Sequence, residues 1–94
     1  MRTLIWSDAF ATCFKRWMRK RPDLREVVAE TLRLLTIEPF APQLETHKLK
    51  GKLAGSWACS AGYDLRIVFD FVKAGKSGED DILLLAIGSH EEVY

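Results

Sequence analysis

The sequence predicts an α+β domain, in which a mostly antiparallel sheet carries a helical hairpin on one face. Two stretches with apolar residues at helical spacing follow one another in the first half of the chain. Three strand-like runs bounded by turn residues fill the second half. With a short strand at the start, the order is β-α-α-β-β-β. The length of 94 residues suits one modest core, so we expect residues 1–94 to form a single domain.

The first half of the chain reads as a strand followed by two helices. Residues 3–6 predict a short strand, after which Ser7 offers an N-cap. An apolar stripe follows at Phe10, Phe14, Trp17 and Met18. The helical pattern breaks at residues 21–23, and we expect Asp23 to cap a second helix whose stripe runs from residue 24 to residue 35. Because the break is short, the two helices should form an antiparallel hairpin.

The second half reads as a basic connection followed by a β-meander. Residues 39–55 predict an irregular connection rich in lysine. Three strands are expected at residues 56–61, 65–72 and 81–87. A tight turn joins the first two strands, and a loop rich in turn-forming residues joins the last two.

The composition is that of an ordinary globular protein, with 48% hydrophobic and 29% charged residues. No apolar run approaches the roughly 20 residues that cross a membrane, so no membrane association is expected. The first residues lack the features of a signal peptide, which predicts a cytoplasmic protein. Cys13 and Cys59 lie far apart in apolar surroundings, which indicates two buried thiols and neither a disulfide nor a zinc site.

The net charge of +1 conceals an asymmetry between the two halves of the chain. Residues 1–52 carry 11 Lys and Arg against 6 Asp and Glu, a balance of +5. Residues 53–94 carry 3 against 7, a balance of −4. The positive half could attract a polyanion such as RNA, whereas the near-neutral whole disfavours indiscriminate binding of nucleic acid.

Five residues could carry chemistry at one end of the predicted sheet: His47, Asp64, Arg66, His90 and Tyr94. In a meander, the start of the middle strand lies beside the end of the third, which brings Asp64 and Arg66 to His90. His47 enters the meander and could reach the same region. Two imidazoles can serve as general base and general acid, and a guanidinium can stabilise charge on a phosphate. Tyr94 could stack on an unpaired base.

The basic connection could hold the backbone of a nucleic acid through Lys48, Lys50 and Lys52. Together these groups match the needs of a metal-independent ribonuclease, for which no metal and no cofactor is expected. Each residue also has a plainer interpretation when it is taken singly. The histidines and lysines could be solvated, Asp64 could form a turn, and Arg66 could lie on a solvated strand face.

Three segments of the chain resemble the RelE/ParE toxin superfamily, most closely its YafQ-like branch. They are the loop at residues 47–51 (HKLKG), the strands within residues 57–69, and the ending at residues 88–94 (GSHEEVY). The resemblance implies a RelE-like fold and the toxin of a bacterial type II toxin–antitoxin system. It further implies a ribosome-dependent mRNA interferase that cuts translated mRNA without a metal and is silenced by a cognate antitoxin.

The resemblance also implies a role for each candidate residue. His47 and His90 would be the acid/base pair, and Asp64 would support a histidine. Arg66 would contact the scissile phosphate, and Tyr94 would contact the RNA.

One strand departs from the YafQ-like pattern, since Ala58 and Ser60 occupy positions where that branch often carries polar catalytic residues. This departure favours a cleavage-deficient module, so two other functions on the same scaffold stay open beside the ribonuclease. One is a ParE-like inhibitor of DNA gyrase, which needs no acid/base pair. The other is a cleavage-deficient module that only binds an antitoxin or the ribosome. Fold alone does not separate these three functions.

Overall fold

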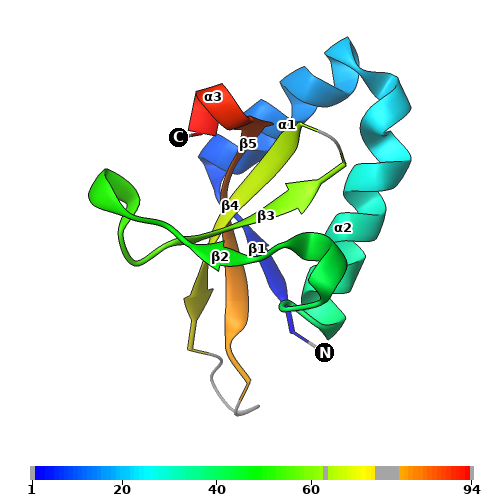
Figure 1. Cartoon of the computed structure of the whole chain (residues 1–94). Helices are drawn as coiled ribbons and strands as arrows, with labels where there is room; N and C mark the ends of the chain where they lie inside the picture. Colours follow the sequence, from blue (N-terminus) through cyan, green and yellow to red (C-terminus); the bar gives the residue numbers. More distant parts are fainter. Residues whose placement is uncertain (1, 63, 74–78, 94) are drawn as a thin grey trace.

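The computed structural model describes residues 2–62, 64–73 and 79–93, except for the side chain of residue 92. The predicted order of elements is confirmed, with five short additions: the strand β2, the helix α3 and three 3-10 turns (Figure 1). The helices are α1 (Asp8–Lys20), α2 (Arg25–Ile37) and α3 (His90–Val93), and three 3-10 turns are η1 (Pro22–Leu24), η2 (Pro42–Leu44) and η3 (Gly51–Leu53). The strands are β1 (Leu4–Trp6), β2 (His47–Lys48), β3 (Trp57–Ala61), β4 (Leu65–Val72) and β5 (Asp81–Ser89).

The five strands form one sheet in the order β1-β5-β4-β3-β2. Strand β1 runs parallel to β5, and all other neighbours are antiparallel, so the predicted mostly antiparallel sheet and its meander are confirmed. The connection expected to be irregular instead contains β2, which pairs with the start of β3. Two residues are too short a run to show strand periodicity in a sequence, which explains why this strand was missed.

Both long helices cover the same face of the sheet. One buried cluster joins Phe10 of α1 and Leu35 of α2 to Ile67 and Phe69 of β4, all with no exposed surface. In β4 these core residues alternate with Arg66 and Val68, which are absent from the cluster and therefore point to the opposite face. That opposite face, which α1 and α2 leave uncovered, is called the open face below.

The helix boundaries follow from the capping residues in one case only. Ser7 caps α1 as expected, because its hydroxyl accepts the Phe10 N–H at 3.1 Å. The prediction that Asp23 caps α2 is wrong: Leu24 is the N-cap and makes no side-chain hydrogen bond there. The Asp23 carboxylate pairs with Arg21 at 2.9 Å, and this hydrogen bond lowers the pKa of Asp23.

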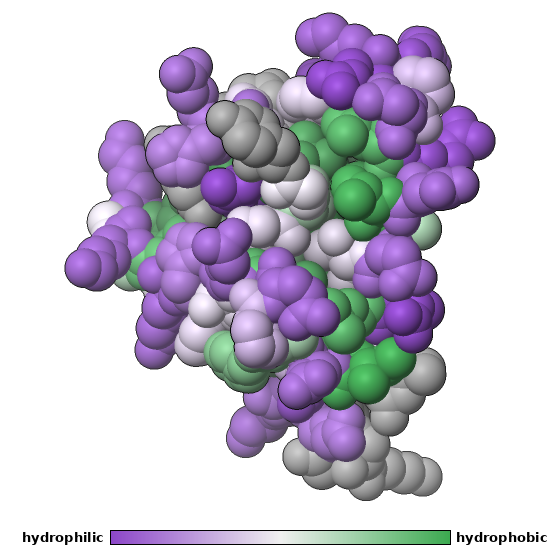
Figure 2. Space-filling view, turned by 45° about the vertical axis from the view of Figure 1, so that its right-hand side comes forward, coloured by the Kyte–Doolittle hydropathy of each residue, from purple (hydrophilic) through white to green (hydrophobic). Residues whose placement is uncertain are grey.

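Figure 2, which brings the α2 side forward, shows small apolar patches among hydrophilic side chains. Across the chain as far as it is described, no helix is long and apolar enough to span a membrane. Cys59 is fully buried, as expected, whereas Cys13 is half-buried beside the core.

Candidate active site

The open face is organised in rows of residues that lie directly opposite one another across the strands. Ser60 on β3 and Gly88 on β5 flank Arg66 on β4. The next row contains Ala58, Val68 and Ala86 on the same three strands, and His47 on β2 extends it. Since opposed residues point to the same side of a sheet, His47, Ser60 and Arg66 share the open face.

Arg66 places a guanidinium on this face. The flanking Leu65 and Ile67 are buried in the core, so the strand fixes the position from which the half-buried Arg66 extends. Its Nη1 donates to the Leu65 carbonyl oxygen at 3.1 Å. Within the described ranges, no carboxylate forms an ion pair with it. A guanidinium has five N–H donors, so most of them remain to hold an anion such as a phosphate.

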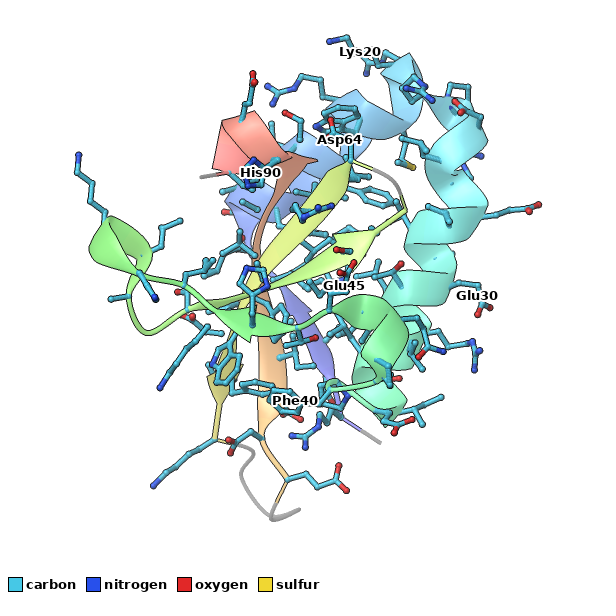
Figure 3. The ribbon with its side chains drawn as sticks, viewed as in Figure 1. Lys20, Glu30, Phe40, Glu45, Asp64 and His90 are labelled. Atoms are coloured by element: carbon cyan, nitrogen blue, oxygen red, sulfur yellow. The ribbon has the colours of Figure 1, made fainter. Side chains whose placement is uncertain are left out.

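His90 lies at the same end of the sheet as Arg66. It is exposed and begins α3, directly after the last residue of β5, which pairs with Leu65. Figure 3 places His90 and Asp64 at this end. Asp64 precedes β4 and lines a hollow of about 150 Å³ together with Trp17, so it borders the turn of the helical hairpin. The structure therefore brings Arg66 and His90 to one end of the open face, with Asp64 toward the helices.

His47 approaches from the other side of the open face. With ideal sheet spacing, its Cα lies about 12 Å from the Cα of Arg66, two strands across and two residues along. The ring Nδ1 lies 3.0 Å from the carbonyl oxygen of Glu45. A carbonyl only accepts, so this bond assigns the proton to Nδ1 and the lone pair to Nε2 in the neutral ring.

Glu45 is a residue of this face that the sequence analysis missed. Its φ of 50° places it in the left-handed region, and it is the one non-glycine residue with positive φ among those the structure describes. Its carboxylate accepts a hydrogen bond from the Ser60 hydroxyl at 3.3 Å (Figure 3). Since Ser60 lies opposite Arg66, this bond brings a negative charge to the row that contains Arg66. The only signal in the sequence is that a carboxylate stands two residues before His47.

The basic connection forms a hollow of about 450 Å³ beside β2, lined by His47, Lys48, Leu49, Lys50, Lys52 and Leu53. All three lysines are exposed. The ammonium of Lys48 lies 5.7 Å from the centroid of the Trp57 ring, in reach of a cation–π contact. Lys50 directly precedes η3 and Lys52 lies within it. The three predicted lysines thus line one hollow that also contains His47. Tyr94 lies outside the described residues.

The part of the chain that the structure describes contains no group of three His, Cys, Asp or Glu side chains that could hold a metal ion. The residues on the open face offer acid/base groups and fixed positive charge. Such a set can bind a phosphodiester and move protons at its oxygens.

Comparisons with solved structures find toxins of the same fold. A copper-bound mutant toxin from Helicobacter pylori is 31% identical over the full length of both chains, with a TM-score of 0.70. A YoeB/ParE toxin from Agrobacterium tumefaciens is 23% identical, over 94% of this chain and 98% of that one, with a TM-score of 0.75. The DinJ–YafQ complex from E. coli matches all of this chain and 99% of that one at 14% identity and a TM-score of 0.78. No protein-family model and no curated protein matches the sequence.

Proposed function

Because the chain belongs to the RelE/ParE toxin superfamily, we propose that it is the toxin of a type II toxin–antitoxin system and a ribosome-dependent endoribonuclease. Its substrate is mRNA under translation, and the reaction uses neither a metal nor a cofactor. The observation that carries this proposal is the Arg66 guanidinium, which makes one hydrogen bond to the residues that the structure describes. It shares the open face with His47, and His90 begins α3 at the end of the neighbouring strand.

The proposed reaction is an attack of the 2′-hydroxyl on the neighbouring phosphate. His47 takes the hydroxyl proton at Nε2, since its Nδ1–H is held by the Glu45 carbonyl oxygen. The 2′-oxygen–phosphorus bond forms and the phosphorus–5′-oxygen bond breaks, while His90 protonates the leaving 5′-oxygen. Arg66 stabilises the charge that develops on the phosphate oxygens. The products are a 2′,3′-cyclic phosphate and a free 5′-hydroxyl.

The remaining candidates support binding in this proposal. Lys48, Lys50 and Lys52 hold the RNA backbone from one hollow, Asp64 supports a histidine, and Tyr94 contacts a base. The partners are the ribosome with its mRNA and a cognate antitoxin, which the similarity to the DinJ–YafQ complex supports. The protein then acts in the bacterial cytoplasm, where translation takes place.

Primer-extension mapping of mRNA 5′ ends after brief induction in bacteria tests this function. The wild type is compared with His90→Ala and with Glu91→Ala, which changes the next exposed side chain on α3. We expect new ends in translated frames with the wild type and Glu91→Ala, and none with His90→Ala. Cleavage that persists in His90→Ala would refute the assignment of the acid.

Two other outcomes would replace the proposed function. Growth arrest without new mRNA ends would favour an inhibitor of another target, such as DNA gyrase. Soluble protein that causes neither arrest nor cleavage would favour a binding module. The second outcome has one observation in its favour, namely that Ala58 and Ser60 leave β3 without an ionisable side chain on the open face.

A further inference from the structure

Three hollows on the surface are linked in series by lining residues that they share. The basic hollow beside β2 includes Leu53, which also borders a second hollow of about 280 Å³. Val68 and Ala86 of the open face line this second hollow, together with Arg16 of α1. Arg16 in turn borders a third hollow of about 330 Å³ on the outer side of α1. The series of hollows runs from β2 across the open face to α1, and we call it the groove below.

The sheet explains why α1 meets this groove. Strand β1 pairs with β5 only as far as Leu84, so from Leu85 onward β5 has β4 on one side and no described strand on the other. A bulge between Val68 and Phe69 interrupts the register at the same level. Beside this unpaired edge of β5, Cys13 and Arg16 of α1 line the second hollow, which is called the middle hollow below.

The groove passes beneath the helix that carries His90. Val93 lines the middle hollow, and residues three apart in a helix lie on the same side, so His90 stands over the groove. Figure 1 shows α3 at the end of β5, in agreement with this placement. The middle of the groove is apolar, whereas both of its ends are basic.

The α1 end of the groove is a stripe of cations. Lys15, Arg16 and Arg19 line the third hollow with Thr12, at the 3- and 4-residue spacings that place side chains on one side of a helix. All three are exposed, and the only acidic residue of α1 is Asp8, in its first turn. Lys15 and Arg19 form no ion pair with any other described residue.

We propose that the α1 stripe is the far end of an RNA-binding track, where it binds the backbone of the single-stranded substrate several nucleotides from the scissile phosphate. A groove with an apolar middle and cationic ends suits a single strand, whose bases pack on the floor while its phosphates meet the charges. That the polyanion is RNA rests on the proposed function; the groove and its charges do not.

Binding of uncleavable RNA measures this track independently of cleavage. The probes are fluorescent 2′-O-methyl RNAs of four and of twelve nucleotides, which lack the attacking hydroxyl, and a twelve-base-pair RNA duplex. Fluorescence anisotropy over a series of KCl concentrations compares the wild type with Lys15→Ala/Arg19→Ala. The matched control is Lys20→Ala/Arg25→Ala, which removes the same charge from exposed helix positions outside the groove.

The stripe variant should bind the twelve-nucleotide strand about tenfold more weakly and lower the slope of log K against log salt by about 1.4, or about 0.7 for each lost phosphate contact. The four-nucleotide strand and the control variant should change less than about twofold. The proposal would be overturned if both variants lost the same affinity, or if the stripe variant lost as much affinity for the four-nucleotide strand as for the twelve-nucleotide strand. An unchanged affinity of the stripe variant for the longer strand would overturn it as well. If the stripe variant lost more affinity for the duplex than for the single strand, the inference that the partner is single-stranded would be overturned. Circular dichroism checks that both variants are folded.

The outcomes also separate this inference from the proposed function. A wild type that binds the longer strand through the stripe but produces no new mRNA ends would refute the endoribonuclease and retain the track. Cleavage in cells with no contribution of the stripe to binding would refute the track alone.

Discussion

Replacing Glu45 by glycine tests whether its backbone conformation serves the site or the stability of the fold. Glu45 has a φ of 50°, its carbonyl oxygen bonds His47 Nδ1, and its carboxylate accepts the Ser60 hydroxyl. A left-handed conformation costs an L-residue with a Cβ atom about 1–2 kcal/mol, which glycine recovers. If the left-handed backbone of Glu45 mattered only for folding, Glu45→Gly should leave cleavage unchanged.

Two losses oppose that gain. Glycine makes the unfolded chain more flexible, which costs about 0.4–1 kcal/mol of stability. The bond to Ser60 is long at 3.3 Å and solvent-exposed, so its loss costs no more than about 0.5–1 kcal/mol. The free energy of unfolding of Glu45→Gly should therefore lie within about 1 kcal/mol of the wild-type value, a shift in Tm of at most about 4–8 °C. Glu45→Gln retains both the strain and the acceptor, and its stability should change still less.

Cleavage activity, in contrast to stability, should change markedly in Glu45→Gly. Glycine lets the turn sample other conformations, so the carbonyl no longer holds the His47 ring, and cleavage should fall although stability does not. The imidazole ¹⁵N chemical shifts of His47 should report the Nδ1–H tautomer in the wild type and Glu45→Gln, and a mixture of tautomers in Glu45→Gly. Loss of more than about 2 kcal/mol in urea unfolding would mean that Glu45 is structural. Full cleavage by a folded Glu45→Gly with an averaged tautomer would refute its role in positioning His47.

Two further predictions concern the core strands. Arg66→Ala should lower the rate of single-turnover cleavage by about 10²- to 10³-fold, because the charge that develops on the phosphate loses its donor. Lys73→Ala, which removes an exposed charge, should leave this rate unchanged. Equal effects of the two variants would mean that Arg66 acts only as a general surface charge. Burial raises the pKa of the Cys59 thiol to about 12, so Cys59 should resist iodoacetamide at pH 8 in the folded protein and react after unfolding. Mass spectrometry of the Cys13→Ser variant measures this labelling. Stoichiometric labelling of folded Cys13→Ser would contradict the burial of Cys59.

The sequence predicted the long elements because their patterns are local. The stripe of α1 and the apolar alternation of β4 span enough residues for periodicity to show, and β4 was predicted with its observed bounds. Short elements failed for the opposite reason. Two residues of β2 and four of α3 give no period. The cap predicted at Asp23 is wrong because an aspartate before a helical stripe does not reveal which partner its carboxylate will bind, here Arg21.

The site was predictable where a strand carries it. The register of an antiparallel meander follows from the strand order, so the expected approach of Arg66 and His90 required no further information. Glu45 was missed because its contribution depends on a left-handed backbone and on a hydroxyl fifteen residues later in the chain. The groove to α1 was missed because it depends on where β1 stops pairing with β5, which no local pattern encodes.

The same alternation that builds the core also fixes which residues of β4 lie on the open face. Leu65 and Ile67 are buried on one side of β4, and Arg66 between them must extend to the other, so the guanidinium cannot leave the open face without unpacking the core. His47 lies instead on β2, a two-residue edge strand whose one neighbour among the described strands is β3. The core thus fixes the position of Arg66, whereas the proposed base lies on a short edge strand. Substitutions that loosen β2 should therefore impair proton transfer before they impair phosphate binding, and a pH–rate profile would separate the two.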